Sequence, residues 1–104
     1  MSSKELTKQQ ASPELINKLK ERDSSVRQNA TKTIGVMGDE NSIGFIIAVL
    51  MKDNNRYVRQ EGVHALGQIG GTRALEALTQ ALVEEKNIFV QDSIKKAIEE
   101  LQPK

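Results

Sequence analysis

Few residues in this sequence are suited to acid–base or metal chemistry. His64 is the only histidine among the 104 residues, and there is no cysteine. Disulfides, thiolate catalysis and cysteine-ligated metals are thereby excluded, and a reducing compartment would suit the chain. Catalysis by His64 would need a partner and a pocket, whereas Glu61, three residues earlier, is placed for a surface pair along one helix. We therefore expect no catalytic residue, no metal site and no cofactor, and a protein that is not an enzyme.

Six polar residues recur at a regular spacing that would suit binding to a partner. Lys32, His64 and Lys96 are 32 residues apart, and each follows another member of the set by four residues. Residues four apart lie on one face of a helix. The set therefore predicts a mildly basic row that binds an acidic peptide or helix, and the alternative is an ordinary solvated face. Its members are Gln28, Lys32, Gln60, His64, Asp92 and Lys96.

This row belongs to a repeat that runs through the whole sequence. Val26-Arg27-Gln28 recurs as Val58-Arg59-Gln60 and again as Val90-Gln91-Asp92. The apolar residues that follow each copy recur at the same offset and share one helical face. We expect three amphipathic helices that bury equivalent stripes, among them the sets Ile34, Leu66 and Ile98, and Met37, Ile69 and Leu101.

A further helix precedes each of these three. Ser12-Pro13-Glu14 has the order of an N-cap, a first-turn proline and a first-turn acid, which predicts a helix that ends near Arg22. Ser42 and Thr72 are candidate N-caps for two more helices, running to about Met51 and Leu82. The polar turns Asp23-Ser24-Ser25, Asp53-Asn54-Asn55 and Glu85-Lys86-Asn87 can cap the second helix of each pair. Gly38 and Gly70-Gly71 end the first two of those helices.

The sequence thus predicts an all-α solenoid of six helices in three antiparallel pairs. Each pair alone leaves an apolar stripe uncovered, so neighbouring pairs must stack. We expect repeats over about 12–40, 41–71 and 72–102, within a domain of residues 12–104 that follows a flexible segment of residues 1–11.

The segments that carry the repeat resemble HEAT-type repeats, of the short kind named after phycobilisome lyases. Ala65-Leu66-Gly67-Gln68-Ile69-Gly70 is the most specific part, and the resemblance covers roughly residues 13 to 101. It implies an α-α superhelix with the second helices on the concave side. Since such repeats occur in lyases, a hydroxylase, chaperone-like factors and scaffolds, it implies little about function.

One enzymatic relative can be tested residue by residue. Deoxyhypusine hydroxylase is similar in its repeats but has His-Glu pairs just after the Val-Arg dipeptide, and these bind two irons. The matching positions here are Gln28-Asn29, Gln60-Glu61 and Asp92-Ser93. None is a His-Glu pair, so the resemblance does not extend to an iron site.

Arg27 and Arg59 stand beside the apolar stripe, each with an aspartate shortly before it, Asp23 or Asp53. In similar repeats such residues form a ladder between neighbours, so we expect charge-assisted bonds that brace the stack. Gln91 interrupts this ladder, as suits a terminal repeat. Two glycines, Gly35 and Gly67, are expected on the exposed side of second helices, where each costs about 1 kcal/mol relative to alanine.

The sequence therefore favours a protein-interaction module or scaffold that binds its partner on the concave face, helped by exposed apolar residues such as Val63 or Ile88-Phe89. The alternative is an accessory subunit or chaperone of a phycobilin-lyase-like enzyme assembly. A net charge of +1 argues against nucleic acid and anionic membrane as partners. No apolar stretch approaches the ~18 residues of a membrane span, and no signal-peptide core follows Met1, so we expect a cytoplasmic protein. A homodimer that covers one end of the short stack remains open.

Overall fold

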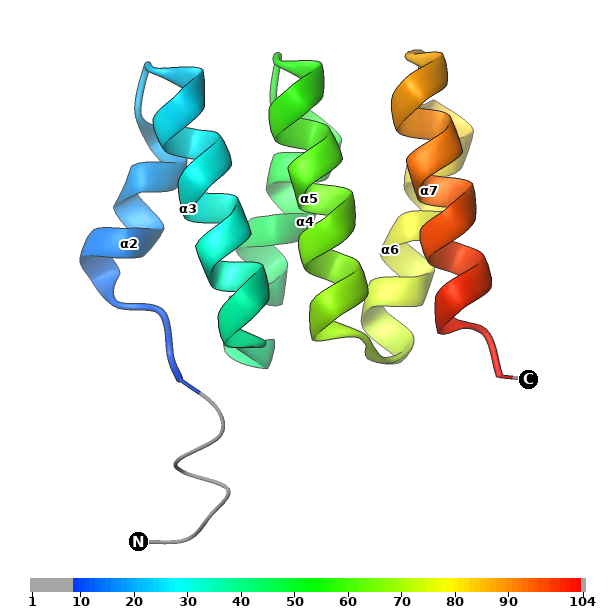
Figure 1. The fold of residues 1–104 in the computed structure, drawn as a ribbon, viewed down its shortest axis with the longest axis horizontal. Coiled ribbons are helices and arrows are strands. Elements are labelled where there is room, and N and C mark those ends of the chain that lie inside the picture. Colours follow the sequence, from blue (N-terminus) through cyan, green and yellow to red (C-terminus); the bar gives the residue numbers. More distant parts are fainter. Residues whose placement is uncertain (1–8, 104) are drawn as a thin grey trace, which may run out of the picture.

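The computed structural model describes residues 9–103, and this part of the chain folds into a short stack of paired helices (Figure 1). In order, the elements are α2 (Pro13–Asn17), the 3-10 helix η1 (Lys18–Lys20), α3 (Ser24–Met37), the 3-10 helix η2 (Glu40–Ser42), α4 (Ile43–Lys52), α5 (Arg56–Ile69), α6 (Gly71–Glu84) and α7 (Ile88–Leu101). The expected all-α solenoid is confirmed. The first helix is shorter than expected, because it tightens into η1 and ends at Lys20.

The helices form two layers. α3, α5 and α7 lie side by side in front in Figure 1, and α4 and α6 lie behind them. α3 contacts α5 and α5 contacts α7 along the first layer, whereas α4 and α6 contact each other less. The family resemblance implies that the second helices of the pairs form the concave side, and we call the layer of α3, α5 and α7 the concave layer.

Polar side chains fix where several helices begin. The Ser12 hydroxyl accepts a hydrogen bond from the Leu15 N–H at 3.1 Å, and Asp23 accepts one from the Ser25 N–H. Asn55 and Asn87 each accept two backbone N–H groups at the starts of α5 and α7. These four caps satisfy amides that a helix end leaves unpaired and confirm the expected starts.

The two remaining predicted caps are wrong. The Ser42 hydroxyl donates to Asp39 at 2.6 Å instead of capping α4, and η2 occupies the turn before it. α6 begins at Gly71, ahead of Thr72, and has no side-chain cap. Both Gly70 and Gly71 have positive φ angles, 71° and 88°. Glycine adopts this conformation at little cost, so the chain reverses within two residues and α6 starts before Thr72 could cap it.

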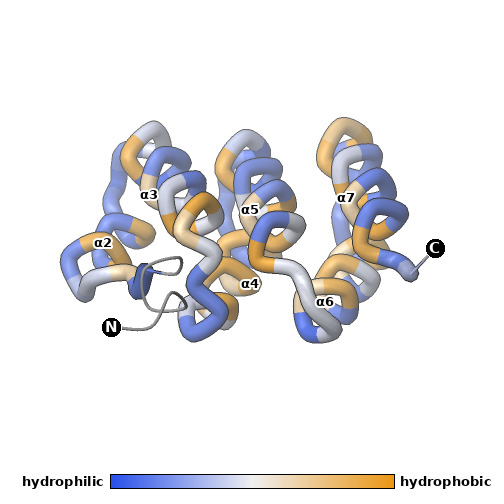
Figure 2. The backbone as a smooth tube through the Cα atoms, turned by 60° about the horizontal axis from the view of Figure 1, so that its bottom comes forward, coloured by the Kyte–Doolittle hydropathy of each residue, from blue (hydrophilic) through white to orange (hydrophobic). Residues whose placement is uncertain are grey.

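The core lies between the two layers, where apolar residues of both face one another (Figure 2). Its fully buried side chains include Ile34, Ile46, Leu66, Leu78 and Ile94. Val63 is also completely buried, so the expectation that it stays exposed for a partner is wrong. None of the helices in residues 9–103 is long and apolar enough to cross a bilayer.

The start of the domain is fastened to the first turn between repeats. The Ala11 N–H donates to Asp39 Oδ2 at 2.9 Å, and Asp39 is buried. Burial alone would raise the pKa of Asp39, but hydrogen bonds from Ser42, Ala11 and Asn41 outweigh it and hold this pKa below its usual value. The predicted flexible segment of residues 1–11 falls mostly on residues 1–8, which lie outside the described part of the chain.

Candidate binding surface

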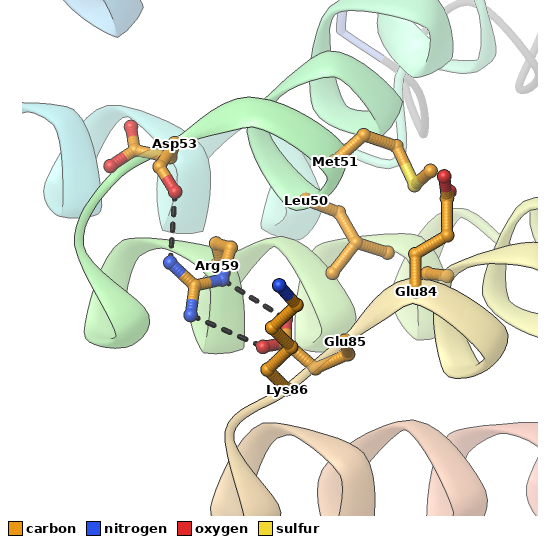
Figure 3. Close-up of a pocket in the computed structure, with 8 residues that line it drawn as sticks. Leu50, Met51, Asp53, Arg59, Glu84, Glu85 and Lys86 are labelled. Atoms are coloured by element: carbon orange, nitrogen blue, oxygen red, sulfur yellow. Dashed lines mark hydrogen bonds and ion pairs between the residues drawn. The ribbon is translucent and has the colours of Figure 1, made fainter.

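Two arginines brace neighbouring repeats at one edge of the stack. Arg27 contacts both carboxylate oxygens of Asp53, through Nε at 2.9 Å and through Nη2 at 3.1 Å. Arg59 contacts both oxygens of Glu85 in the same way, at 3.0 and 3.2 Å (Figure 3). Such forked pairs fix geometry as well as adding energy. The expected ladder is confirmed, with glutamate in place of aspartate at its second step.

Each of these arginines also holds the turn of its own repeat. Nη1 of Arg27 donates to the Glu21 carbonyl and Nη1 of Arg59 to the Asp53 carbonyl, six residues upstream in both cases. Gln91, the matching residue of the third repeat, donates to the Glu85 carbonyl at 2.6 Å. Gln91 thus makes the hydrogen bond within its own repeat but not the ion pair that Arg27 and Arg59 make with the next turn.

The brace changes the acidity of its carboxylate. Burial would raise the pKa of Glu85, but the hydrogen bonds and charge of Arg59, with the Asn87 N–H, lower it below its ordinary value. The shallow cavity beside this pair has a volume of about 220 Å³ and is also lined by Leu50 and Met51. Its strongest charges already satisfy one another, so the cavity offers little to a ligand.

The six-residue row divides into two groups. Gln28 and Gln60 are half-buried and point to the next repeat: Gln28 donates to Glu61 at 3.4 Å and Gln60 to Ser93 at 2.9 Å. These two residues tie the repeats together. The other four side chains are exposed, namely Lys32, His64, Asp92 and Lys96.

His64 forms the pair expected from the sequence. Its Nδ1 lies 3.9 Å from Glu61 Oε2, at the long end of an ion pair, and its side chain is 59% exposed. Such an exposed pair contributes little to stability. Glu61 is only 16% exposed and also accepts from Gln28, so it belongs to the ties between repeats.

A cleft opens between α5 and α7 on the concave layer, and we call it the α5/α7 cleft. Its volume is about 440 Å³. Its apolar floor is the half-buried Ala97, with the completely buried Val63 beneath it, and polar side chains surround this floor. The lining residues are Val63, His64, Gly67, Gln68, Ser93, Lys96, Ala97 and Glu100. The cleft therefore brings together His64 and Lys96 of the predicted row, while the row's other four members lie outside it.

The two glycines differ in how closely the next helix packs against them. A Cβ placed on Gly35 would lie 2.7 Å from the Ala65 Cα and 2.6 Å from Gln68 Oε1, so α5 packs directly onto it. Gly35 is thus buried, and its predicted exposure is wrong. Gly67 is the matching residue one repeat later, yet its Cβ position has no atom within 4 Å. The contact that closes α3 against α5 is absent between α5 and α7.

A second feature lies at the N-terminal ends of the same two helices. The Arg56 guanidinium sits 4.4 Å from the ring centre of Tyr57 and 5.0 Å from that of Phe89. We call these three residues the arginine clamp. Tyr57 is 53% exposed, Phe89 59% and the adjacent Ile88 63%, which confirms the expected exposure of Ile88-Phe89.

The fold and the repeat geometry agree with a comparison to known families. The sequence profile of HEAT repeats matches residues 12–99, most of the chain. The chain belongs to the HEAT repeat family. Curated protein sequences gave no match.

Solved structures contain similar HEAT repeat segments. Epoxyqueuosine reductase, in a selenomethionine-labelled crystal, matches with 27% identity and a TM-score of 0.68 over 74% of this chain and 20% of that one. The Bacillus subtilis epoxyqueuosine reductase matches with the same identity, score and coverage of this chain, and 21% of its own length. This HEAT repeat chain therefore spans about a fifth of those proteins.

The sequence analysis missed the arginine clamp and the α5/α7 cleft. The clamp did carry a signal, since Tyr57 and Phe89 are 32 residues apart and both follow a capping asparagine outside the apolar stripe. The cleft depends on the distance between the helices of two neighbouring HEAT repeats, and a comparison of matching positions in the sequence does not give this distance. Among residues 9–103, no group of three histidine, aspartate or glutamate side chains could hold a metal ion.

Proposed function

We propose that this HEAT repeat chain is a non-enzymatic binding module that holds a partner protein along its concave layer, in the α5/α7 cleft. The observation that carries this proposal is the uncovered Gly67. A glycine inside a helix costs about 1 kcal/mol relative to alanine. Close packing explains that cost at Gly35, and approach of a partner's backbone or side chain would explain it at Gly67.

The composition of the cleft supports binding to a protein. Its apolar floor can accept a small apolar side chain, each buried methylene of which contributes about 0.8 kcal/mol. Around the floor stand Lys96 and Glu100, neither of which forms an ion pair with another described residue. Polar groups around an apolar centre are the usual anatomy of a protein interface.

Filling the cleft tests the proposal. In Gly67→Leu, leucine is a good helix former and enters open space, so the fold should persist while the cleft is blocked. Thr79→Leu, on the exposed face of α6, is the matched control in the other layer. Affinity capture from a lysate of the source organism should recover a partner with wild type and Thr79→Leu and lose it with Gly67→Leu. Equal capture by all three would show that the cleft is not the site.

The predicted row has a separate test. The triple change Lys32→Glu, His64→Glu, Lys96→Glu reverses its cations on all three helices of the concave layer. Since His64 and Lys96 also line the cleft, Lys32→Glu alone tests the part of the row outside it. Loss of the partner with Lys32→Glu as well as with Gly67→Leu would extend the binding surface from the cleft to α3. Loss with Gly67→Leu and the triple variant, but not with Lys32→Glu, would confine binding to the cleft.

A second candidate is an accessory subunit or chaperone of an enzyme assembly, such as a phycobilin-lyase-like one. It is favoured by the occurrence of a similar repeat segment within epoxyqueuosine reductase. Visible absorbance of protein purified from the source organism distinguishes the pigment-linked form of this idea, since bound pigment would support it and a colourless protein would count against it.

A further inference from the structure

The arginine clamp is the main concentration of exposed apolar side chains on the described part of the chain. Six large apolar side chains are exposed there. Two of them, Tyr57 and Phe89, contact Arg56, and a third, Ile88, is next to Phe89 in the sequence. Tyrosine, phenylalanine and arginine are enriched in the cores of protein interfaces. Two neighbouring aromatic rings that are each more than half exposed therefore favour an interaction surface here.

Arg56 differs from the arginines of the ladder in what it contacts. Arg27 and Arg59 each form an ion pair in which Nε lies 2.9–3.0 Å from a carboxylate oxygen. Arg56 instead lies over two rings and donates one Nη2 hydrogen bond, at 2.6 Å, to the Tyr57 hydroxyl, and no described carboxylate pairs with it. Stacking holds the planar guanidinium in place and leaves donors at its edge, which is the geometry that binds a carboxylate through two bonds.

At the clamp itself, the charge without a partner among the described residues is the cation of Arg56. Lys86, in the turn before α7, is exposed and adds a second cation. The nearby acids are largely engaged, since Glu85 pairs with Arg59 and Glu61 with His64 and Gln28. Two acids of this region stay exposed, namely Glu84, two residues before Lys86, and Asp92, one turn along α7 from Phe89.

The clamp and the α5/α7 cleft lie on one face of the same helix pair. Tyr57, His64 and Gln68 follow one another at seven- and four-residue steps along α5, and Phe89, Lys96 and Glu100 do so along α7. Such positions share a helical face. The ten residues from Tyr57 to Gly67 span about 15 Å at 1.5 Å per residue, which an extended peptide covers with about five residues.

We infer that the arginine clamp binds the carboxylate of an acidic segment whose apolar side chain, about five residues away, enters the α5/α7 cleft. This inference rests on the proposed function and names the chemistry of the partner. A nucleic acid strand, which also stacks on rings and arginine, fits less well, because the chain offers only two such rings here and its net charge is +1.

Selection from a random-peptide display library, panned on the full chain, tests the inference. Enriched peptides should combine aspartate or glutamate with an apolar residue at that spacing. In fluorescence anisotropy with a synthetic enriched peptide, Arg56→Gln should weaken binding about tenfold or more, the scale of a charge-assisted bond, and Arg56→Lys should weaken it less. Arg22→Gln, which removes an exposed arginine outside the clamp, is the matched control and should bind like wild type.

The outcomes separate the two proposals. Changing the peptide's acid to its amide should cost nothing further in Arg56→Gln, because the bond is already lost. Enriched peptides without acids, or peptides lost with Gly67→Leu and unaffected by Arg56→Gln, would overturn the clamp and leave the cleft. If no peptide is enriched, or if a labelled single-stranded RNA binds and Phe89→Ser abolishes that binding, both proposals fail.

Discussion

At the scale of single residues, Gly35 and Gly67 occupy equivalent places and meet opposite surroundings. Gly35 lies against the Ala65 backbone, and Gly67 faces open space. The repeat alone would assign both the same role, and only the packing distinguishes them. Close packing therefore explains the glycine at position 35, whereas no contact within the described chain explains the one at position 67.

Alanine at each glycine should move stability in opposite directions. Gly67→Ala should raise the free energy of unfolding by about 0.5–1 kcal/mol, because it removes backbone entropy from the unfolded chain without a clash. Gly35→Ala should lower it by about 1–3 kcal/mol, because the added methyl overpacks the α3–α5 contact. Urea denaturation followed by circular dichroism measures both. Stabilisation in both variants would contradict the close packing at Gly35.

Acid should weaken the fold through Glu85. Its pKa is lowered in the folded chain, so the folded state favours the ionised form. The resulting stability is complete above the unfolded pKa, whose ordinary value is 4.5, and is lost as the pH falls through the lower folded value. Melting temperature should hold near neutrality and drop below about pH 4.5. Glu85→Gln should be less stable at pH 7 and show a shallower drop, and an unchanged drop would assign acid sensitivity elsewhere.

At the scale of the helical pair, the brace between repeats is built from a residue that serves two turns. Arg59 bonds its own turn through the Asp53 carbonyl and the next turn through Glu85. Gln91 keeps only the first of these bonds. The exchange of arginine for glutamine therefore marks where the described stack ends.

Arg59→Gln should give the middle repeat the hydrogen-bonding pattern that Gln91 has in the third repeat. Glutamine can keep the bond to the upstream carbonyl, as Gln91 does, but it leaves Glu85, only 6% exposed, without its cation. We expect a loss of about 1–3 kcal/mol, the usual cost of an unsatisfied buried polar group. Urea denaturation measures it, with Arg22→Gln as the exposed control. A loss no larger than that of the control would mean that the brace contributes little.

At the scale of the whole molecule, the repeat was readable from the sequence because solenoid packing uses equivalent residues in each unit. The 32-residue offset, the apolar stripe and the polar turns before the second helices together predicted the six helices and their pairing. The predicted caps at Ser42 and Thr72 were wrong for different reasons. The Ser42 hydroxyl donates to Asp39 instead, and the positive φ angles of Gly70 and Gly71 let α6 begin before Thr72.

The site was less predictable than the fold. The sequence placed His64 and Lys96 on one face, and the structure has both in the lining of one cleft, but that cleft comes from the wider separation of α7 from α5. Gln28 and Gln60, assigned to binding, instead form hydrogen bonds between repeats. A helical pattern shows which residues share a face, and it does not show how closely two such faces approach each other.

The stack should unfold as one cooperative unit, because each pair buries its stripe against its neighbours. Tyr57 is the only tyrosine and there is no tryptophan, so intrinsic fluorescence reports the middle repeat alone. The transitions followed by fluorescence and by far-ultraviolet circular dichroism should coincide in urea. Separate midpoints would show that the repeats unfold independently.

The most direct test of the central claim is an amide chemical-shift map of the ¹⁵N-labelled chain with its captured partner or an enriched peptide. A binding module that uses the concave layer predicts the largest changes on α5 and α7, at Gly67, Gln68 and Ala97 in the cleft and at Tyr57 and Phe89 in the clamp. Changes centred on α4 and α6 would contradict the account, because they would place the partner on the opposite layer.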